Sequence, residues 1–315
     1  MGRYVAVRLG HAMIVMVILS MVTFALLLAA PGGPAIMMSP DLSPDEAARM
    51  KQNLGLNDPV HIQYLRWVWT MVRGDFGISY TDSRAVTELI GERLPASLLL
   101  IGVALLEALI LGVGAGVIAA LKRGSIFDHA LSLITALGVA VPTFWLAILC
   151  ILVFAVQLRV LPSSGMRTIG ADGGVMDVLW HLVLPSFVVS VTFMARFARF
   201  ARSGLLEVLG RDYVRTARAK GLADGAVVMH HALRNALIPL VTVIGFAMPV
   251  LVGGTAISET IFGWPGMGRL AVDAAFRRDY PVVMGVTMAV ALVVVVSNLL
   301  VDLLYVYLDP RVKLS

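Results

Sequence analysis

Residues 9–30 read LGHAMIVMVILSMVTFALLLAA, and Arg3 and Arg8 precede them. About 20 consecutive apolar residues are enough to cross the hydrocarbon core of a bilayer as a helix. A cleavable secretory signal has an apolar core of only about 7–15 residues, which is shorter than this run. We therefore predict that the chain begins with an uncleaved helix that spans a membrane.

The composition of the whole chain is that of a membrane protein. The 315 residues are 59% hydrophobic and 14% charged, with a mean hydropathy of +0.88. A soluble domain is nearer about 45–50% apolar and about 25% charged. The net charge of +5 comes from loops between apolar runs, so membrane topology explains it better than nucleic-acid binding. Cys150 is the single cysteine, which excludes an internal disulfide and a Cys-based metal site.

Five further apolar runs predict an all-α polytopic membrane protein with six transmembrane helices. We expect Pro95 to lie in the first turn of the second span and Pro142 to kink the third. Arg196 and Arg199 interrupt the fourth span and are expected at or beyond the lipid edge. The predicted spans after the first are 97–121, 130–156, 182–201, 237–257 and 282–304.

The distribution of positive charge predicts how the chain is oriented. Six spans place both termini on the same side of the membrane. Most Lys and Arg residues lie in short segments on that side, above all in residues 196–234. The long segment 31–96 lies on the other side, and long loops count little in the positive-inside rule. Both termini are therefore predicted to be cytoplasmic.

The external segment carries helix signals of its own. The stretch SPDEAARM at 43–50 offers Ser43 as the N-cap of a capping box. A second helix is predicted within 58–74, where Trp67 and Trp69 flank an apolar face. Such an aromatic amphipathic helix is typical of the membrane interface, and a docking surface for another protein is the alternative.

The sequence holds no motif for catalysis or for nucleotide binding that we can identify. The patterns G-x-x-x-x-G-K-[ST], H-E-x-x-H and G-x-S-x-G do not occur. The six histidines are not spaced as metal ligands, because the adjacent His230 and His231 point about 100° apart on a helix. We therefore predict a chain that is not an enzyme and that binds no cofactor or metal itself.

Glu107 is the one acidic residue deep in an apolar run. An unpaired charge at that depth is costly, so an acid there is a candidate for function. One interpretation is that Glu107 lines a water-filled pathway or pairs with another subunit. The alternative is a protonated or hydrogen-bonded packing residue. Nearby, Gly112 and Gly116 lie one turn apart, a spacing that favours close helix packing.

Residues 211–221, RDYVRTARAKG, are a basic segment between two apolar runs. Asp212 is a candidate N-cap, and Gly221 fits the position after the end of a short helix. A second helical stretch, DGAVVMHHALRNALIP at 224–239, leads back towards the membrane. The positive-inside rule explains the charge but not this compact helical hairpin. Such a hairpin in a cytoplasmic loop is typical of a docking site for a cytoplasmic protein.

These segments resemble the permease subunits of binding-protein-dependent ABC importers for dipeptides and oligopeptides, to which nickel and glutathione permeases are similar. Their coupling loop has the pattern E-A-A-x-x-x-G, which aligns here with Arg215-Thr216-Ala217 and Gly221, so that arginine replaces the glutamate. The resemblance covers nearly the whole chain. Other segments that carry it are PGGPA (31–35), GDFGISY (74–80), ETIFGWPGMGRLAVDAAFRRDYPV (259–282) and NLLVDLLYVYLDPR (298–311).

The resemblance implies a type I ABC importer permease fold. It implies an N-terminal part, 1–94, with one transmembrane helix and an external helical segment. A transmembrane domain, 95–308, would follow, with its coupling loop at about 203–235. The chain would form a pathway for peptides in the inner membrane of a bacterium. Nickel complexes or glutathione are alternative cargoes, and an ion-coupled secondary transporter is a less favoured alternative because the chain shows no internal repeat.

The same resemblance implies partners and their contact sites. A second homologous permease, two cytoplasmic ATPase subunits that use ATP and Mg, and an external binding protein would complete the importer. Gly221 is expected to matter more than Arg215 or Arg218 for coupling. The ATPase contacts expected are Arg215, Thr216, Ala217, Arg218, Lys220 and Gly221. The turn of Trp264, Pro265 and Gly266 is expected either to meet the binding protein or to anchor its aromatic tip at the lipid interface.

Overall fold

The computed structural model describes residues 2–30, 33, 45, 49, 52, 55, 57–170 and 173–308, with some side chains inside helices excepted. These residues form helices joined by loops, and an isolated antiparallel bridge pairs Ile78 with Ala85. The N-cap predicted at Ser43 lies outside the described residues. The chain forms two compact units, one of residues 1–97 and 265–295 and one of residues 98–264 and 296–314.

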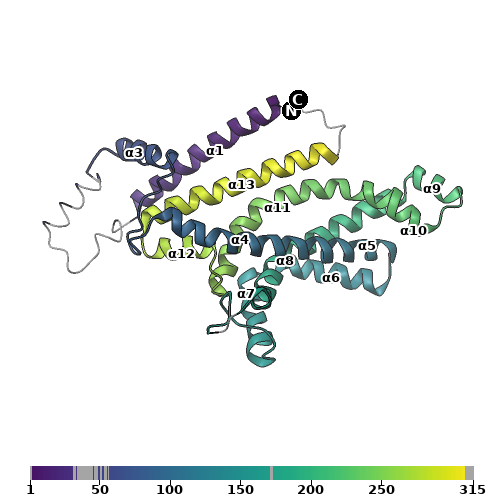
Figure 1. Ribbon diagram of the computed structural model, residues 1–315. Helices are drawn as coiled ribbons and strands as arrows, with labels where there is room; N and C mark the ends of the chain where they lie inside the picture. Colours follow the sequence, from purple (N-terminus) through teal and green to yellow (C-terminus); the bar gives the residue numbers. More distant parts are fainter. Residues whose placement is uncertain are drawn as a thin grey trace. The chain divides into compact units, whose positions relative to one another are not determined.

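The first unit pairs the N-terminal helix with an amphipathic helix. The elements are α1 (Gly2–Ala29), α3 (Val60–Val72), the first part of α4 (Val86–Glu107), α12 (Met267–Phe276) and the first part of α13 (Tyr280–Leu308), all labelled in Figure 1. Ser20 of α1 and Tyr64 of α3 share a hydrogen bond of 2.7 Å. The ring of Phe24 lies edge-on to that of Tyr64, with centroids 5.5 Å apart. Trp69 is exposed on the other face of α3.

A buried carboxylate organises the loop that precedes α4. Asp279 accepts hydrogen bonds from Ser79, from the backbone N–H of Tyr80 at 3.2 Å and from the hydroxyl of Thr81 at 2.9 Å. A buried carboxylate is tolerated when hydrogen bonds replace its water. Burial, and then the Asp279 charge, raises the pKa of the Tyr80 phenol, so this side chain stays neutral. The loop at 74–85 is thereby joined to the start of α13.

The second unit is built around one long helix, α8 (Val175–Leu209). Small residues allow its close packing. A Cβ atom on Gly116 would lie 2.3 Å from the carbonyl oxygen of Ala198, and one on Gly112 would lie 2.7 Å from that of Met194. The close approach predicted for these two glycines is confirmed. The other elements are the rest of α4, η2 (Ala108–Val113), α5 (Gly114–Leu121), α6 (Ile126–Ala140), α7 (Thr143–Cys150), η3 (Ile151–Gln157), α9 (Asp212–Ala219), α10 (Asp224–Ala226), η4 (Val227–Leu233), α11 (Arg234–Ile261) and the end of α13.

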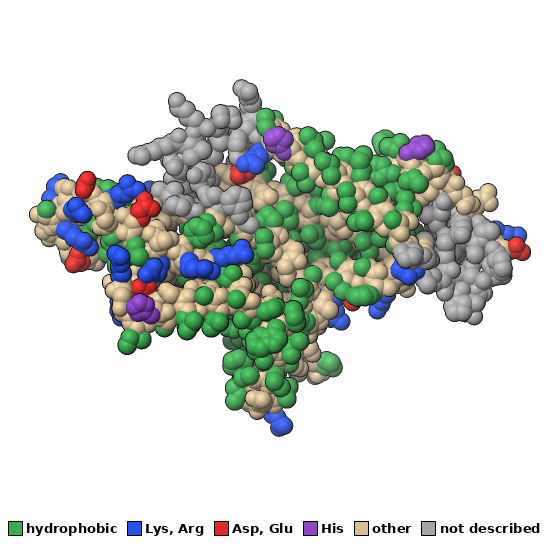
Figure 2. Space-filling view, turned by 180° about the vertical axis from the view of Figure 1, so that it is seen from behind, with side chains coloured by type: hydrophobic (Ala, Val, Ile, Leu, Met, Phe, Trp, Pro, Cys, Tyr) green, Lys and Arg blue, Asp and Glu red, His purple; other side chains and the backbone are tan. Residues whose placement is uncertain are grey.

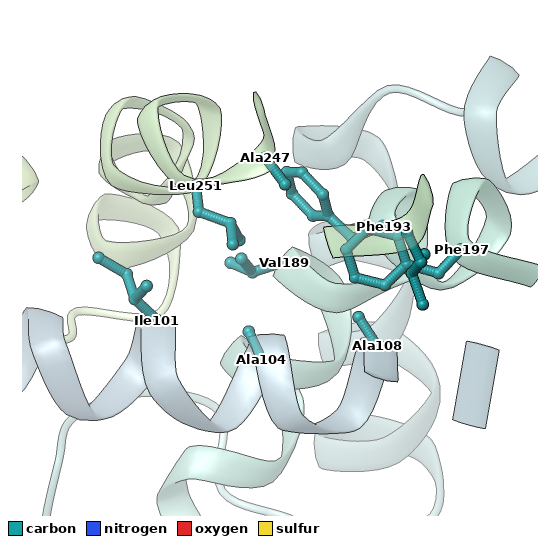
Figure 3. Packing of buried hydrophobic residues seen from close by; sticks show 9 residues of the cluster. Ile101, Ala104, Ala108, Val189, Phe193, Phe197, Ala247 and Leu251 are labelled. Carbon is teal, nitrogen blue, oxygen red and sulfur yellow. The ribbon is translucent and has the colours of Figure 1, made fainter. Parts of the chain in front are cut away.

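The core of the second unit lies where α4, η2, α8 and α11 meet. Figure 3 shows the rings of Phe193 and Phe197 on α8 close to Ala108, with Leu251 of α11 beside Val189. Lipid is as apolar as these side chains, so in a membrane it is their close packing, not their removal from water, that holds the helices together. This cluster therefore fixes α8 along much of its length, so that its C-terminal end can carry the loop that follows.

Part of the predicted span pattern is confirmed. Among the described residues, four helices are long and apolar enough to cross a membrane, or five spans if one bent pair counts as one. The four lie at 6–29, 86–121, 175–209 and 280–302. The fifth predicted span, 237–257, is helical throughout within α11. Six spans and cytoplasmic termini remain predictions.

The two prolines behave differently from expectation. Pro95 lies inside α4, which already begins at Val86, so the prediction that Pro95 opens the helix was wrong. Val86 and Leu89 are buried in the core of the first unit, and this packing extends the helix ahead of the proline. At Pro142 the chain bends by 107° between α6 and α7, far more than the predicted kink. The residue before the proline, Val141, is extended, as proline requires.

Candidate functional site

The basic loop forms the predicted short helix and glycine turn. Helix α9 starts at Asp212, but its N-cap is Arg211, in an extended conformation, so the cap predicted at Asp212 was wrong. Gly221 has a φ of +81°, the left-handed conformation expected after a helix end. Apart from its chain neighbours, none of the described residues comes within 4 Å of the position that its Cβ would occupy, so backbone conformation alone favours glycine here.

The loop has a small apolar core of its own. Val214 and Ala217 of α9 pack against Val227 of η4 and against Val208 and Leu209 of α8. Ala217, predicted as an ATPase contact, is 7% exposed and lies inside the loop. The reason is helical geometry, because residues three apart share a face and Val214 is buried.

The outer face of α9 is polar and basic. The exposed residues of this face among those predicted are Arg215, Thr216, Arg218 and Lys220. Arg218 pairs with Asp224 at 3.0 Å across the glycine turn, and the Arg215 and Asp212 side chains lie 3.8 Å apart. Exposed pairs of this kind contribute about 0–1 kcal/mol each. Figure 2 shows Lys and Arg side chains gathered at the end of the second unit that carries α9 and α10.

Glu107 ends α4 directly before the π-helical segment η2. One carboxylate oxygen accepts a hydrogen bond of 2.8 Å from the hydroxyl of Ser186, a buried residue of α8. The other oxygen, Oε2, is buried and has no hydrogen-bond partner within the described part of the chain. Of the two interpretations left open by the sequence, the hydrogen-bonded packing residue has a contact to support it. A role for Glu107 in a pathway stays a prediction.

In the turn at 264–266, Trp264 and Gly266 are buried and Pro265 is half-buried. Trp264 is 0% exposed, and its backbone N–H donates to the carbonyl of Glu259 at 2.8 Å. Gly266 is buried as the N-cap of α12. The prediction of an exposed aromatic tip was wrong, because the large apolar surface of a Trp side chain is more stable in the core. At the end of α12, Phe276 is an exposed aromatic residue, 86% exposed, which the sequence analysis did not single out.

Sequence reasoning also missed an ion pair between α6 and α8. Asp128 is 3% exposed and accepts hydrogen bonds from Nε and Nη2 of Arg202, the latter at 2.8 Å. The backbone N–H of Gly124 donates to the same carboxylate at 3.0 Å. The signal that could have found half of this pair is Ser125, three residues before Asp128, which is the spacing of a helix N-terminus.

Across the described ranges, no group of three or more His, Cys, Asp or Glu side chains is placed to hold a metal ion. What the second unit offers is mechanical: a compact basic loop attached to a long, closely packed helix. Such an arrangement can carry a displacement from the surface of the loop to the apolar helices, because close-packed elements move as bodies.

Comparison with known proteins identifies the family. Residues 112–314 match the family described as "Binding-protein-dependent transport system inner membrane component". Residues 1–101 match the family described as "Binding-prot-dependent transport system membrane comp, N-term". The chain belongs to this family of transport-system membrane components. The resemblance noted in the sequence is therefore confirmed over nearly the whole length of this permease.

Relatives of the permease match it from end to end. The oligopeptide transport system permease protein AppB of Bacillus subtilis (strain 168) is 40% identical over 99% of this chain and 100% of its own length. The dipeptide transport system permease protein DppB of Escherichia coli (strain K12) is 39% identical over 99% of both chains.

A solved structure supports the fold of the permease. The MetNI methionine ABC transporter in its inward-facing conformation matches with a TM-score of 0.54 at 19% identity, over 71% of this chain and 97% of that one. At this identity the likeness concerns the fold alone. The permease therefore shares the helical architecture of an ABC transporter chain.

Proposed function

We propose that this permease is the membrane subunit of an ATP-driven importer in the cytoplasmic membrane of a bacterium, where it forms part of the pathway for di- and oligopeptides. The observation that carries this function is the full-length match to relatives named for oligopeptide and dipeptide transport. Nickel complexes and glutathione are the alternative cargoes. The peptide names of the relatives favour peptides over both.

The loop at about 203–235 supports a partnership with ATPase subunits. The outer face of α9 is largely polar and basic, whereas Val214, Ala217 and Val227 form the core of the loop; Leu222 and Met229 are exposed apolar residues of the same loop. Two cytoplasmic ATPases dock on this loop and on that of a second, homologous permease. ATP and Mg are bound by the ATPases, and this chain performs no covalent chemistry. The contacts of Arg215, Thr216, Arg218 and Lys220 set affinity and register, while Ala217 and Gly221 maintain the shape of the loop.

The importer works as a rigid-body switch. Closure of the ATPases around ATP moves the two coupling loops, and the helices packed on them turn the pathway from inward-facing to outward-facing. A ligand shifts such an equilibrium only by its different affinity for the two states. The close backbone packing of α5 on α8 suits this role, because it lets the two helices move together.

An external binding protein delivers the peptide. Within residues 259–281, the exposed Phe276 and Arg277 are better placed to meet it than the buried Trp264. Aromatic and arginine side chains are enriched among the residues that dominate binding energy at protein interfaces. Phe276 replaces Trp264 as the contact expected on this side.

Reconstitution tests the proposal. The permease is assembled with its sister permease, the two ATPases and the binding protein in liposomes, and uptake of a labelled tripeptide is measured. We expect uptake that needs ATP, the binding protein and this chain together. Uptake driven by an ion gradient without ATP would contradict the proposal, as would ATP-driven uptake of nickel or glutathione with no uptake of peptides.

A further inference from the structure

The C-terminal part of α8 is joined to the start of α6 by a partly buried ion pair. The Arg202 guanidinium donates two hydrogen bonds to the two oxygens of Asp128. Only 4% of the Asp128 side chain and 30% of the Arg202 side chain are exposed. Bidentate pairs of this kind are stronger and more directional than single contacts, and burial protects them from screening by salt.

Asp128 also holds the beginning of α6. Its carboxylate accepts from the N–H of Gly124, and its own N–H donates to the hydroxyl of Ser125, the N-cap, at 3.3 Å. The loop before α6, the first turn of α6 and Arg202 therefore share one carboxylate. A displacement of Arg202 therefore acts on the first turn of α6 through this bidentate contact.

On its other side, the same part of α8 is packed against the coupling loop. Leu205 lies in one apolar cluster with Ala232 and Ala236. A Cβ atom on Gly204 would lie 2.8 Å from the carbonyl oxygen of Ala236, so the two backbones are in close contact. Further along, Val208 packs against Val214 of α9. The end of α8 and the coupling loop thus form a single packed body.

We propose that the Asp128–Arg202 pair is the link through which a displacement of the coupling loop reaches α6, with Arg202 and Asp128 as positioning residues. This inference rests on the proposed importer function. Arg202 precedes the end of α8 at Leu209 by about 10 Å of continuous helix at about 1.5 Å per residue, and α9 begins three residues after that end. Since α6 bends into α7 by 107°, a rotation of α6 also swings the helix that follows it.

The test compares uptake with ATP hydrolysis in the reconstituted importer. Asp128→Asn and Arg202→Gln remove the ion pair, and Arg202→Lys keeps its charge while losing the bidentate geometry. The control is Glu92→Gln, which breaks the exposed bidentate pair of Arg84 and Glu92. The readout is labelled tripeptide taken up per ATP hydrolysed, at equal amounts of assembled complex.

We expect Asp128→Asn and Arg202→Gln to lower uptake per ATP by about 5- to 150-fold, the range of typical coupling between sites. Arg202→Lys is expected to lie between them and the wild type, and Glu92→Gln to match the wild type. Normal uptake per ATP in the two neutral variants would overturn the link. So would a loss in which uptake and hydrolysis fall in proportion, because that describes a merely structural pair.

A second measurement decides the matter if these variants fail to assemble. Spin labels are placed at the exposed positions His129 and Ser203, next to the pair, in a Cys150→Ala background. The link predicts that the distance between the two labels is the same in the nucleotide-free and the ATP-trapped importer. A distance that changes between these two states would overturn the link. Absence of ATP-driven peptide uptake in the wild type would contradict the proposed function instead, so the two failures are distinguishable.

Discussion

Gly116→Ala should destabilise the second unit, although alanine is the better helix former. A Cβ at position 116 would lie 2.3 Å from the carbonyl oxygen of Ala198 and 3.0 Å from its Cα, both backbone atoms. Ordinary contact needs about 1 Å more, so α5 and α8 must separate. Overpacking of this kind costs about 1–3 kcal/mol. The gain from replacing a helical glycine with alanine is about 0.5–1 kcal/mol.

The matched control is Gly114→Ala, two residues earlier in the same helix, where nothing in the described part of the chain outside the helix's own backbone lies within 4 Å of an added Cβ. The two variants share the helix-propensity gain, so their difference isolates the close contact at about 1–3 kcal/mol. At about 2–4 °C per kcal/mol, thermal unfolding of the purified chain in detergent should separate their midpoints by several degrees. Equal midpoints, or a Gly116→Ala variant more stable than wild type, would refute the packing argument.

Three further predictions concern the coupling loop and Glu107. Ala217→Glu buries an unpaired carboxylate and should destabilise the packing of α9 on η4 by at least about 2 kcal/mol, which is measured as faster amide hydrogen exchange in α9. The control is Ala219→Glu at an exposed position, which should leave the exchange rate unchanged. Equal exchange rates in the two variants would count against the loop core. Gly221→Val forces a β-branched residue to a φ of +81° at a cost of roughly 1–2 kcal/mol. It should therefore lower peptide uptake per ATP more than Arg215→Gln does. The reverse order would show that the charge of Arg215 matters more for coupling than the backbone conformation at Gly221. Glu107→Gln keeps an acceptor for Ser186 and should leave peptide uptake within about fivefold, since a net hydrogen bond is worth about 1 kcal/mol. Loss of uptake in an intact complex would point to a charged pathway.

Features that depend on local sequence could be predicted. The apolar runs identified the helices now seen at 6–29, 86–121, 175–209 and 280–302. The short helix of the coupling loop and the left-handed Gly221 were predicted because helix ends have local signals. The tight packing of Gly112 and Gly116 was predicted because small residues one turn apart have few other uses in a membrane helix.

Features that depend on which side of an element is covered could not be predicted. Trp264 stands in a Gly-Trp-Pro-Gly turn, which favours an exposed loop, yet tertiary packing buries it completely. Ala217 belongs to the coupling motif, but the neighbour that covers it, Val227, follows a turn whose geometry the sequence does not specify. Asp128 and Arg202 are 74 residues apart, and only the packing of α6 on α8 brings them together.

Crosslinking from the coupling loop tests the central claim most directly. A photoreactive amino acid replaces the exposed Thr216 in the assembled importer, and a second variant carries it at the exposed Phe276. We predict that position 216 crosslinks to an ATPase subunit, that position 276 does not, and that the yield at 216 changes when ATP is trapped. An importer that takes up peptides with ATP while position 216 never reaches an ATPase would contradict the account.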